Sequence, residues 1–108
     1  MIGGFVANGG NGNAQVLIRA IGPSLGQFGI VSPLADPMLA VFDGNGARLT
    51  SNDNWRDTQE AAIQATGFAP ANDLESAIVA TLPAGNYTAI VSGKNGGSGV
   101  ALVEIYRR

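Results

Sequence analysis

Acidic and amide side chains gather in the middle of this 108-residue sequence. Three aspartates, Asp43, Asp53 and Asp57, lie there together with Asn45 and Asn52. Ca²⁺ takes several carboxylate and carbonyl oxygens from flexible loops, so the stretch is a candidate calcium site, although its spacing is not that of an EF-hand. Asp and Asn also close turns by bonding to their own backbone. We weigh turn formation above metal binding and keep both interpretations open.

Trp55 is the only tryptophan and lies in this polar stretch. Its ring could stack on a sugar, which makes carbohydrate a candidate ligand. The alternative is that the ring folds inward and pins the loop to the core, with its indole N–H bonded to the backbone. Aromatic residues make up only 6% of the chain, too few for a platform of several rings, so the inward position is favoured.

The chain contains neither histidine nor cysteine. Their absence removes the usual general base, histidine-ligated metals, thiolate nucleophiles and disulfides. The serines have no histidine to activate them, and the single lysine, Lys94, does not follow the spacing of a phosphate-binding loop. We therefore predict that the protein is not an enzyme, with no catalytic residues and no cofactor other than the calcium considered above.

Size and charge restrict the partners. The length fits one domain over residues 1–108. A net charge of −2 without a basic run argues against nucleic acid, and no apolar run is long enough for a membrane helix. Residues 1–15 lack the features of a signal peptide. We expect a cytoplasmic chain, a processed secreted protein or an excised domain.

Short apolar segments separated by Gly, Asn and Pro predict a series of strands. They cover residues 2–7, 14–21, 38–42, 47–50, 74–82, 86–92 and 99–106. Residues 43–46 are typical of a hairpin turn, and we expect the last two strands to pair across the Gly-rich segment 93–98. The predicted fold is an all-β antiparallel β-sandwich, jelly-roll-like, with about seven or eight strands.

One short helix is predicted near residues 58–66. Asp57 fits the N-cap and Glu60 the third helical position of a capping box, while Gly67 supplies the stop. Before it, residues 22–37 hold three of the five prolines and are expected to form a long crossing loop.

Several predicted strands are apolar on both faces, whereas a strand with one solvent-exposed face should alternate apolar and polar residues. Either the 22–37 loop and the helix cover the second face, or a neighbouring domain or identical subunit does. In the second case the interface residues would be Phe5, Leu17, Ile21, Val100 and Leu102. The first strand could likewise pair within its own sheet or with the next subunit, because a sheet edge accepts added strands.

Arg19 interrupts one of these apolar strands. A buried arginine needs a carboxylate partner, which Glu104 or Glu75 could provide across strands. We expect this pair to be structural.

Four stretches taken together resemble a β-sandwich repeat domain of large secreted and cell-surface bacterial proteins. They are residues 16–25 (VLIRAIGPSL), 51–55 (SNDNW), 82–93 (LPAGNYTAIVSG) and 99–106 (GVALVEIY). The chain is also similar, more loosely, to bacterial pre-peptidase C-terminal domains. The resemblance implies an extracellular location and a non-catalytic role, and it carries calcium binding over to Asp43 and Asp53 only.

These observations together predict a structural module, secreted or at the cell surface, that associates with copies of itself or with tandem neighbouring domains. Its boldest form is a fibre subunit that self-assembles through a donor strand. The alternative is an accessory module that binds carbohydrate or calcium.

Overall fold

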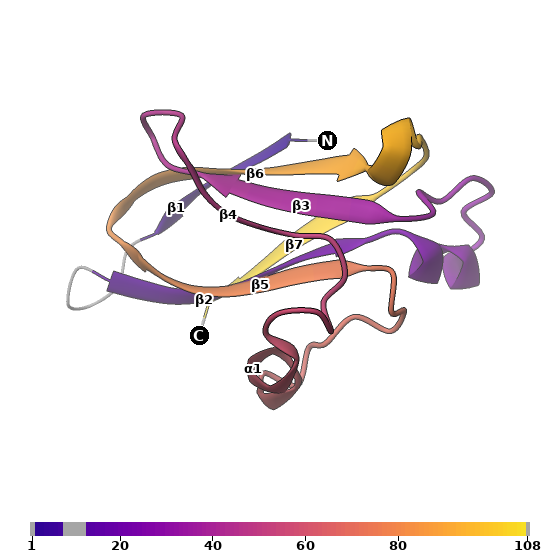
Figure 1. Ribbon diagram of the computed structural model, residues 1–108, viewed down its shortest axis with the longest axis horizontal. Helices are drawn as coiled ribbons and strands as arrows, with labels where there is room; N and C mark the ends of the chain where they lie inside the picture. The colour runs from indigo at the N-terminus through magenta and orange to yellow at the C-terminus, as the bar shows by residue number, and fades with distance from the viewer. Residues whose placement is uncertain (1, 8–12, 108) are drawn as a thin grey trace.

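Two antiparallel β-sheets face each other across an apolar core (Figure 1). The computed structural model describes residues 2–7 and 13–107. Its seven strands are β1 (Ile2–Ala7), β2 (Asn13–Ile21), β3 (Pro37–Phe42), β4 (Arg48–Asn52), β5 (Ser76–Pro83), β6 (Gly85–Gly93) and β7 (Leu102–Arg107). The strand boundaries differ from the predicted ones by no more than three residues, and the all-β sandwich is confirmed.

The larger sheet has the strand order β1–β6–β3–β4, and the smaller sheet has the order β5–β2–β7. Strand β3 shows the expected alternation. Leu39 and Val41 are buried in the core, whereas Met38, Ala40 and Phe42 are half-buried on the outer face. One face of the larger sheet therefore lies on the core and the other remains open.

Strand β2 is covered on both faces. Ile18 packs in the core between the sheets, while Leu17 packs on the opposite side against Trp55, Ile63 and Ala77. Ile63 comes from the helix α1 (Glu60–Ala65), which lies outside the smaller sheet (Figure 1). For this strand, the second apolar face is explained by the chain's own helix and the residues beside it.

The buried carboxylate of Glu75 holds the crossing segment that follows β2. The backbone N–H groups of Gly22 and Ser24 donate to Glu75 Oε2 at 2.8 and 2.9 Å. Ser24 Oγ and the backbone N–H of Asn72 donate to Oε1 at 2.7 and 3.1 Å. This network fixes the start of the 3-10 helix η1 (Pro23–Phe28) against the start of β5.

Arg19 finds the first of its two candidate partners. Its Nε donates to Glu104 Oε1 at 2.8 Å, and its other nitrogens reach the Tyr106 hydroxyl and the carbonyl of Phe68. Arg19 and Glu104 lie directly opposite each other on β2 and β7. Glu75 is engaged elsewhere, so the structural ion pair is with Glu104 alone.

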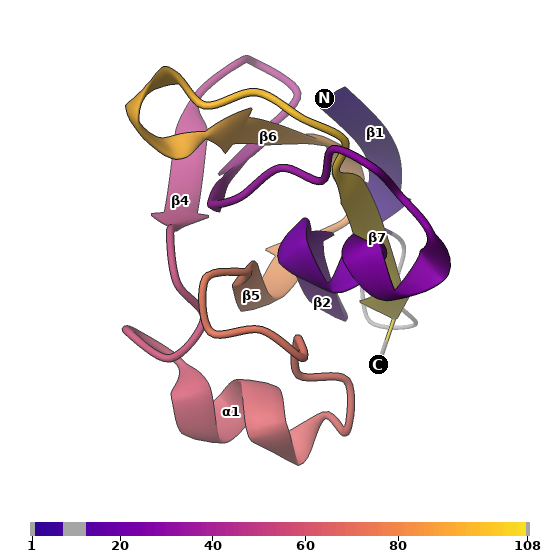
Figure 2. The ribbon, with the colours of Figure 1, turned by 90° about the vertical axis from the view of Figure 1, so that its right-hand side faces the viewer.

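The predicted hairpin between residues 86–92 and 99–106 is wrong. Strand β6 pairs with β1 and β3, whereas β7 pairs with β2 in the other sheet. The connecting segment crosses the end of the sandwich (Figure 2). It passes so close to the first crossing segment that a Cβ at Gly99 would lie 2.7 Å from the nitrogen of Leu34. A glycine in this segment therefore permits a crossing that local turn signals do not reveal.

The predicted start of the helix is also wrong. The N-cap position is Gln59 rather than Asp57, and no side chain caps the helix. The Gln59 amide instead bonds to the backbone of Val79, and Glu60, which is the first helical residue and not the third, is paired with Arg56. Gly67, with a φ of 79°, ends the helix as predicted. No helix in residues 2–7 and 13–107 is long and apolar enough to cross a membrane.

The Glu75 network gives a stability prediction. Glu75→Gln should lower the free energy of unfolding by about 2–4 kcal/mol, because an amide group cannot accept from all of these donors and at least one buried backbone N–H loses its acceptor. Urea denaturation at pH 7 measures this change. Glu60→Gln, at an exposed ion pair, is the control and should change the stability by less than about 1 kcal/mol. Equal effects of the two variants would contradict an anchoring role for Glu75.

Candidate functional site

An open sandwich has four edge strands, which here are β1, β4, β5 and β7. Each edge strand carries backbone N–H and C=O groups that its own sheet does not use, and such an edge can bind another strand. Proteins block most edges with bulges, charges, short strands or covering segments. The way each edge is treated therefore indicates where this domain can bind a partner.

The edge of β5 is covered by the segment between β4 and α1. The backbone N–H of Trp55 donates to the carbonyl of Glu75 at 2.9 Å, and the backbone N–H of Ala77 donates to Asn52 Oδ1 at 3.0 Å. The side-chain amide of Gln59 both accepts from Val79 N–H and donates to its carbonyl. Amide side chains thus take the place of a neighbouring strand over residues 75–79, and this part of the edge is closed.

The edge of β4 is interrupted. This strand has only five residues, and its pairing with β3 shifts register between Val41 and Phe42. The shift leaves Leu49 as an extra residue between the paired Arg48 and Thr50. A bulge, a charged side chain and a short strand are all features that hinder strand addition.

The edge of β7 is partly protected. Just before the strand, Val100 accepts from Leu34 N–H and donates to the carbonyl of Ser32, both at 2.8 Å. The strand itself carries the charged residues Glu104 and Arg107. Within residues 2–7 and 13–107, the outward backbone groups of β7 make no further hydrogen bonds, so its edge is free but charged.

The edge of β1 has none of these protections. Its sequence, IGGFVA, contains no charge and no proline. Ile2 and Val6 are each 71% exposed, while Phe5 stacks on Tyr87 with ring centroids 5.7 Å apart. In the described part of the chain, nothing hydrogen bonds to the outer edge of this strand. Its inner face is held over β7, because a Cβ at Gly3 would lie 3.2 Å from Val103. Strand β1 is therefore the candidate binding edge.

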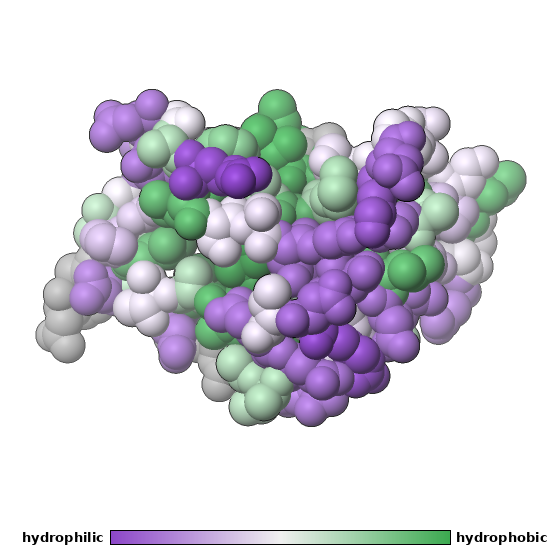
Figure 3. Space-filling model, viewed as in Figure 1, coloured by the Kyte–Doolittle hydropathy of each residue, from purple (hydrophilic) through white to green (hydrophobic). Residues whose placement is uncertain are grey.

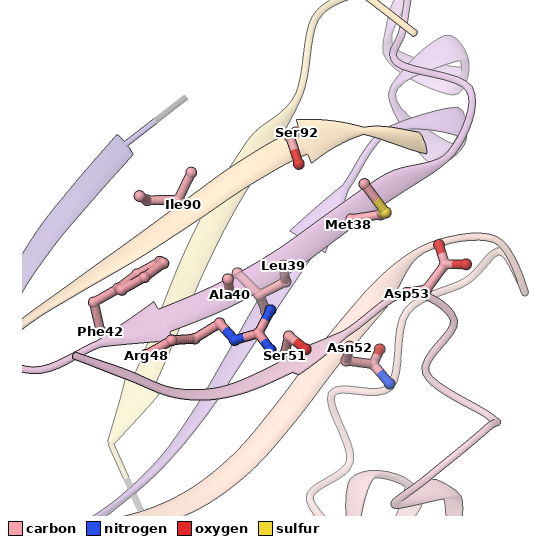
Figure 4. Close-up of a pocket in the computed structure, with 10 residues that line it drawn as sticks. All are labelled: Met38, Leu39, Ala40, Phe42, Arg48, Ser51, Asn52, Asp53, Ile90 and Ser92. Atoms are coloured by element: carbon pink, nitrogen blue, oxygen red, sulfur yellow. The ribbon is translucent and has the colours of Figure 1, made fainter. Parts of the chain in front are cut away.

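The outer face beside β1 is also apolar. Ile2 lies opposite Ile90, and Ile90 lies opposite Ala40, so one apolar row runs across β1, β6 and β3. The row borders a shallow pocket of about 340 Å³ whose wall includes Met38 and Phe42 (Figure 4). Figure 3 shows apolar residues exposed over the larger sheet, whereas hydrophilic residues gather around α1.

The structure places Asp43 at the other end of β4 from Asp53 and Asp57, the other two aspartates considered as metal ligands. Asp43 lies in the β3–β4 turn, where its Oδ1 accepts from the N–H groups of Asn45 and Ala47, both at 2.9 Å. Asp53 follows the other end of β4 and pairs with Lys94, Nζ to Oδ2 at 2.7 Å. Asp57 lies in the next turn, where its N–H donates to the carbonyl of Asn54. Among the residues described, no group of three or more metal-ligating side chains is found.

Trp55 is 2% exposed and packs inside, so its ring offers no face to a sugar. The guanidinium of Arg56 lies over the ring, 4.3 Å from its centroid. The indole N–H has no hydrogen-bond partner among the described residues, in contrast to the expected bond with the backbone.

The five residues considered for an interface differ in exposure. Leu17 and Ile21 are buried within the chain. Phe5 is half-buried, while Val100 and Leu102 are exposed at the β7 side. Reasoning from apolar patterns did not select Ile2 and Val6, the most exposed apolar residues of β1. The signal that could have found them is a first strand without any charge or proline.

A small charge cluster lies where residues 36, 53 and 94 meet. Burial raises the pKa of Asp36, and so do a hydrogen bond and the charge of the neighbouring Asp53 carboxyl, while Lys94 opposes the rise. The hydrogen bond to Asp53 raises the pKa of Lys94. The fold therefore favours the protonated form of Asp36 and the charged form of Lys94.

Because the pKa of Asp36 is raised, replacing this residue with the uncharged asparagine should stabilise the fold by an amount that depends on pH. A group with a raised folded-state pKa stabilises the fold below its unfolded pKa, and this contribution is lost as the pH rises through the folded value. Asp36→Asn should therefore raise the melting temperature at pH 7 by a few degrees and leave it unchanged near about pH 3. Thermal unfolding across pH, with the exposed Asp73→Asn as control, measures the difference. A lower melting temperature at pH 7 would show that attraction to Lys94 outweighs burial and repulsion.

Comparisons with protein-family models, curated proteins and solved structures returned no match for this chain. The function must therefore be inferred from the geometry of the edges and from the residues that form them.

Proposed function

We propose that this domain is a non-catalytic structural module that associates with another copy or a neighbouring domain by strand addition at β1. The observation that carries the proposal is the contrast between the edges. Side chains of Asn52 and Gln59 close the first half of the edge of β5, and a bulge interrupts β4. Strand β1 has no charge, and none of the described residues covers its outer edge.

Strand addition at β1 would satisfy its free backbone groups and bury exposed apolar surface at the same time. Main-chain hydrogen bonds supply affinity in this mode, and alternate side chains supply specificity. Ile2 and Val6 are exposed on the open outer face, where Ile2 lies in the apolar row through Ile90. Contiguous apolar side chains that stay exposed to water commonly mark a site of interaction with another protein.

The setting of this association is also part of the proposal. The resemblance of the sequence to repeat domains of secreted and cell-surface bacterial proteins supports an extracellular location and a role beside tandem domains or other copies. A fibre would need a second binding edge on each copy, and the charged edge of β7 is the remaining one. Contacts between unlike edges propagate without closing.

The geometry gives less support to an accessory module for carbohydrate or calcium. Trp55 is buried, and Asp43 and Asp53 lie at opposite ends of β4. Asp53 is already neutralised by Lys94. Association through β1 is therefore the better supported function.

A charge placed on the free edge should weaken the association. We expect Val6→Lys to raise the dissociation constant at least about tenfold, because a lysine on the open face must lose water when a strand is added. Light scattering over a concentration series measures the mass, which should exceed 11.0 kDa for the unmodified chain and approach it for the variant.

Val31→Lys is the matched control, since Val31 is also highly exposed but lies in the crossing segment. It should assemble like the unmodified chain. A mass of 11.0 kDa for the unmodified chain at every concentration would refute the association itself. Assembly unaffected by Val6→Lys would show that β1 is not the edge used.

A further inference from the structure

We infer that the partner strand at β1 is β1 of a second copy of this chain, antiparallel to it and related by a two-fold axis at Gly4. The inference rests on the proposed function and specifies its partner and register. The two larger sheets would then join into one continuous eight-stranded sheet, since each contributes four strands.

The alternation of β1 restricts how two copies can pair. Ile2, Gly4 and Val6 are exposed on the outer face, while Gly3 and Phe5 are half-buried on the inner face. Directly opposed residues of an antiparallel pair point to the same side of the sheet. In a continuous sheet an outer residue must therefore oppose an outer residue, which excludes every register shifted by one.

An axis at Gly4 pairs the strand with itself over residues 2–6. Ile2 then lies opposite the partner's Val6, and Gly4 lies opposite the partner's Gly4. The exposed apolar side chains of one copy thus meet those of the other. An axis at Phe5 would instead oppose two phenylalanines and leave Ile2 without an apolar partner among the described residues.

The same register places an aromatic ring beside a glycine on the inner face. Phe5 would lie opposite the partner's Gly3, which has no side chain to obstruct the ring. Aromatic side chains opposite glycines stabilise sheet edges because they cover the exposed backbone. Phe5 is already oriented by its stacking on Tyr87.

The charge pattern favours β1 over β7 for self-pairing. A two-fold axis brings identical residues close together, so a charged strand would meet its own charge. Strand β1 has no charged residue, whereas β7 carries Glu104 and Arg107. A contact in which both copies use the same strand also closes, so it forms a dimer and does not propagate as a fibre.

Disulfide trapping tests the register directly, because the chain has no cysteine of its own. Gly4→Cys should form a disulfide-linked dimer under mild oxidation. Opposed Cβ atoms in an antiparallel pair lie about 4.5–5.5 Å apart, close to the separation that a disulfide spans. A Cβ at Gly4 fits, since its nearest neighbour is the Tyr87 carbonyl oxygen at 3.9 Å.

Thr88→Cys is the matched control. Thr88 lies opposite Gly4 on β6 and on the same face. The two copies of Thr88 would be separated by three strand spacings, about 14 Å, which is too far for a disulfide. Equal cross-linking of Gly4→Cys and Thr88→Cys would indicate random collision and overturn the inference.

Two further variants test the register without changing Gly4. Ile2→Cys and Val6→Cys replace exposed side chains. A mixture of the two should form a mixed disulfide, whereas neither should cross-link with itself, because like positions lie about four residues, or 13 Å, apart along the strands. Self-linking without mixed products would overturn the register.

The mass of the unmodified chain in solution distinguishes failure of the association from failure of the two-fold pairing. A monomer at all concentrations that also fails to cross-link would refute both the association and the two-fold pairing. Assembly of the unmodified chain, without Gly4→Cys or mixed cross-links, would refute the two-fold pairing and leave the association in place.

Discussion

The carboxylate of Glu75 is the contact on which much of the structure outside the two sheets depends. Glu75 lies immediately before β5, and its carboxylate accepts hydrogen bonds from Gly22, Ser24 and Asn72. The backbone carbonyl of Glu75 accepts a hydrogen bond from the backbone N–H of Trp55. A charged group can be buried here because it is fully hydrogen-bonded. One residue thereby fixes the turn after β2, the approach to β5 and the loop that carries the only tryptophan.

The position of that loop determines which sheet edges stay open. With Trp55 fixed, Asn52 and Gln59 reach the edge of β5, and Ile63 covers the outer face of β2. The smaller sheet is therefore covered by the chain's own residues on one face and one edge. In the larger sheet, no segment within residues 2–7 and 13–107 covers the outer edge of β1, and this contrast supports association at β1. The remaining free edge of the smaller sheet, β7, differs from β1 in carrying charged residues.

The strands and several local features could be predicted from the sequence. Short apolar segments separated by Gly, Asn and Pro turns predicted all seven strands within three residues. The turn at Asp43, the end of the helix at Gly67 and a carboxylate partner for Arg19 also followed from residue type. The candidate edge at β1 could be selected only in part from the sequence: Phe5 was among the candidate interface residues, but the exposed Ile2 and Val6 were not. Edge protection depends on which side chains reach a strand from distant segments.

What the sequence determined by itself is local: where the chain extends, where it turns and which residues favour a buried face. These properties follow from the preferences of each residue and of its near neighbours. The tertiary structure alone decided that β6 and β7 belong to different sheets, that Gln59 rather than Asp57 precedes the helix, and that Glu104 pairs with Arg19. Each of these outcomes depends on contacts between segments far apart in the chain, 85 residues for Arg19 and Glu104. Local patterns show that a residue needs a partner, and packing selects which partner comes within reach.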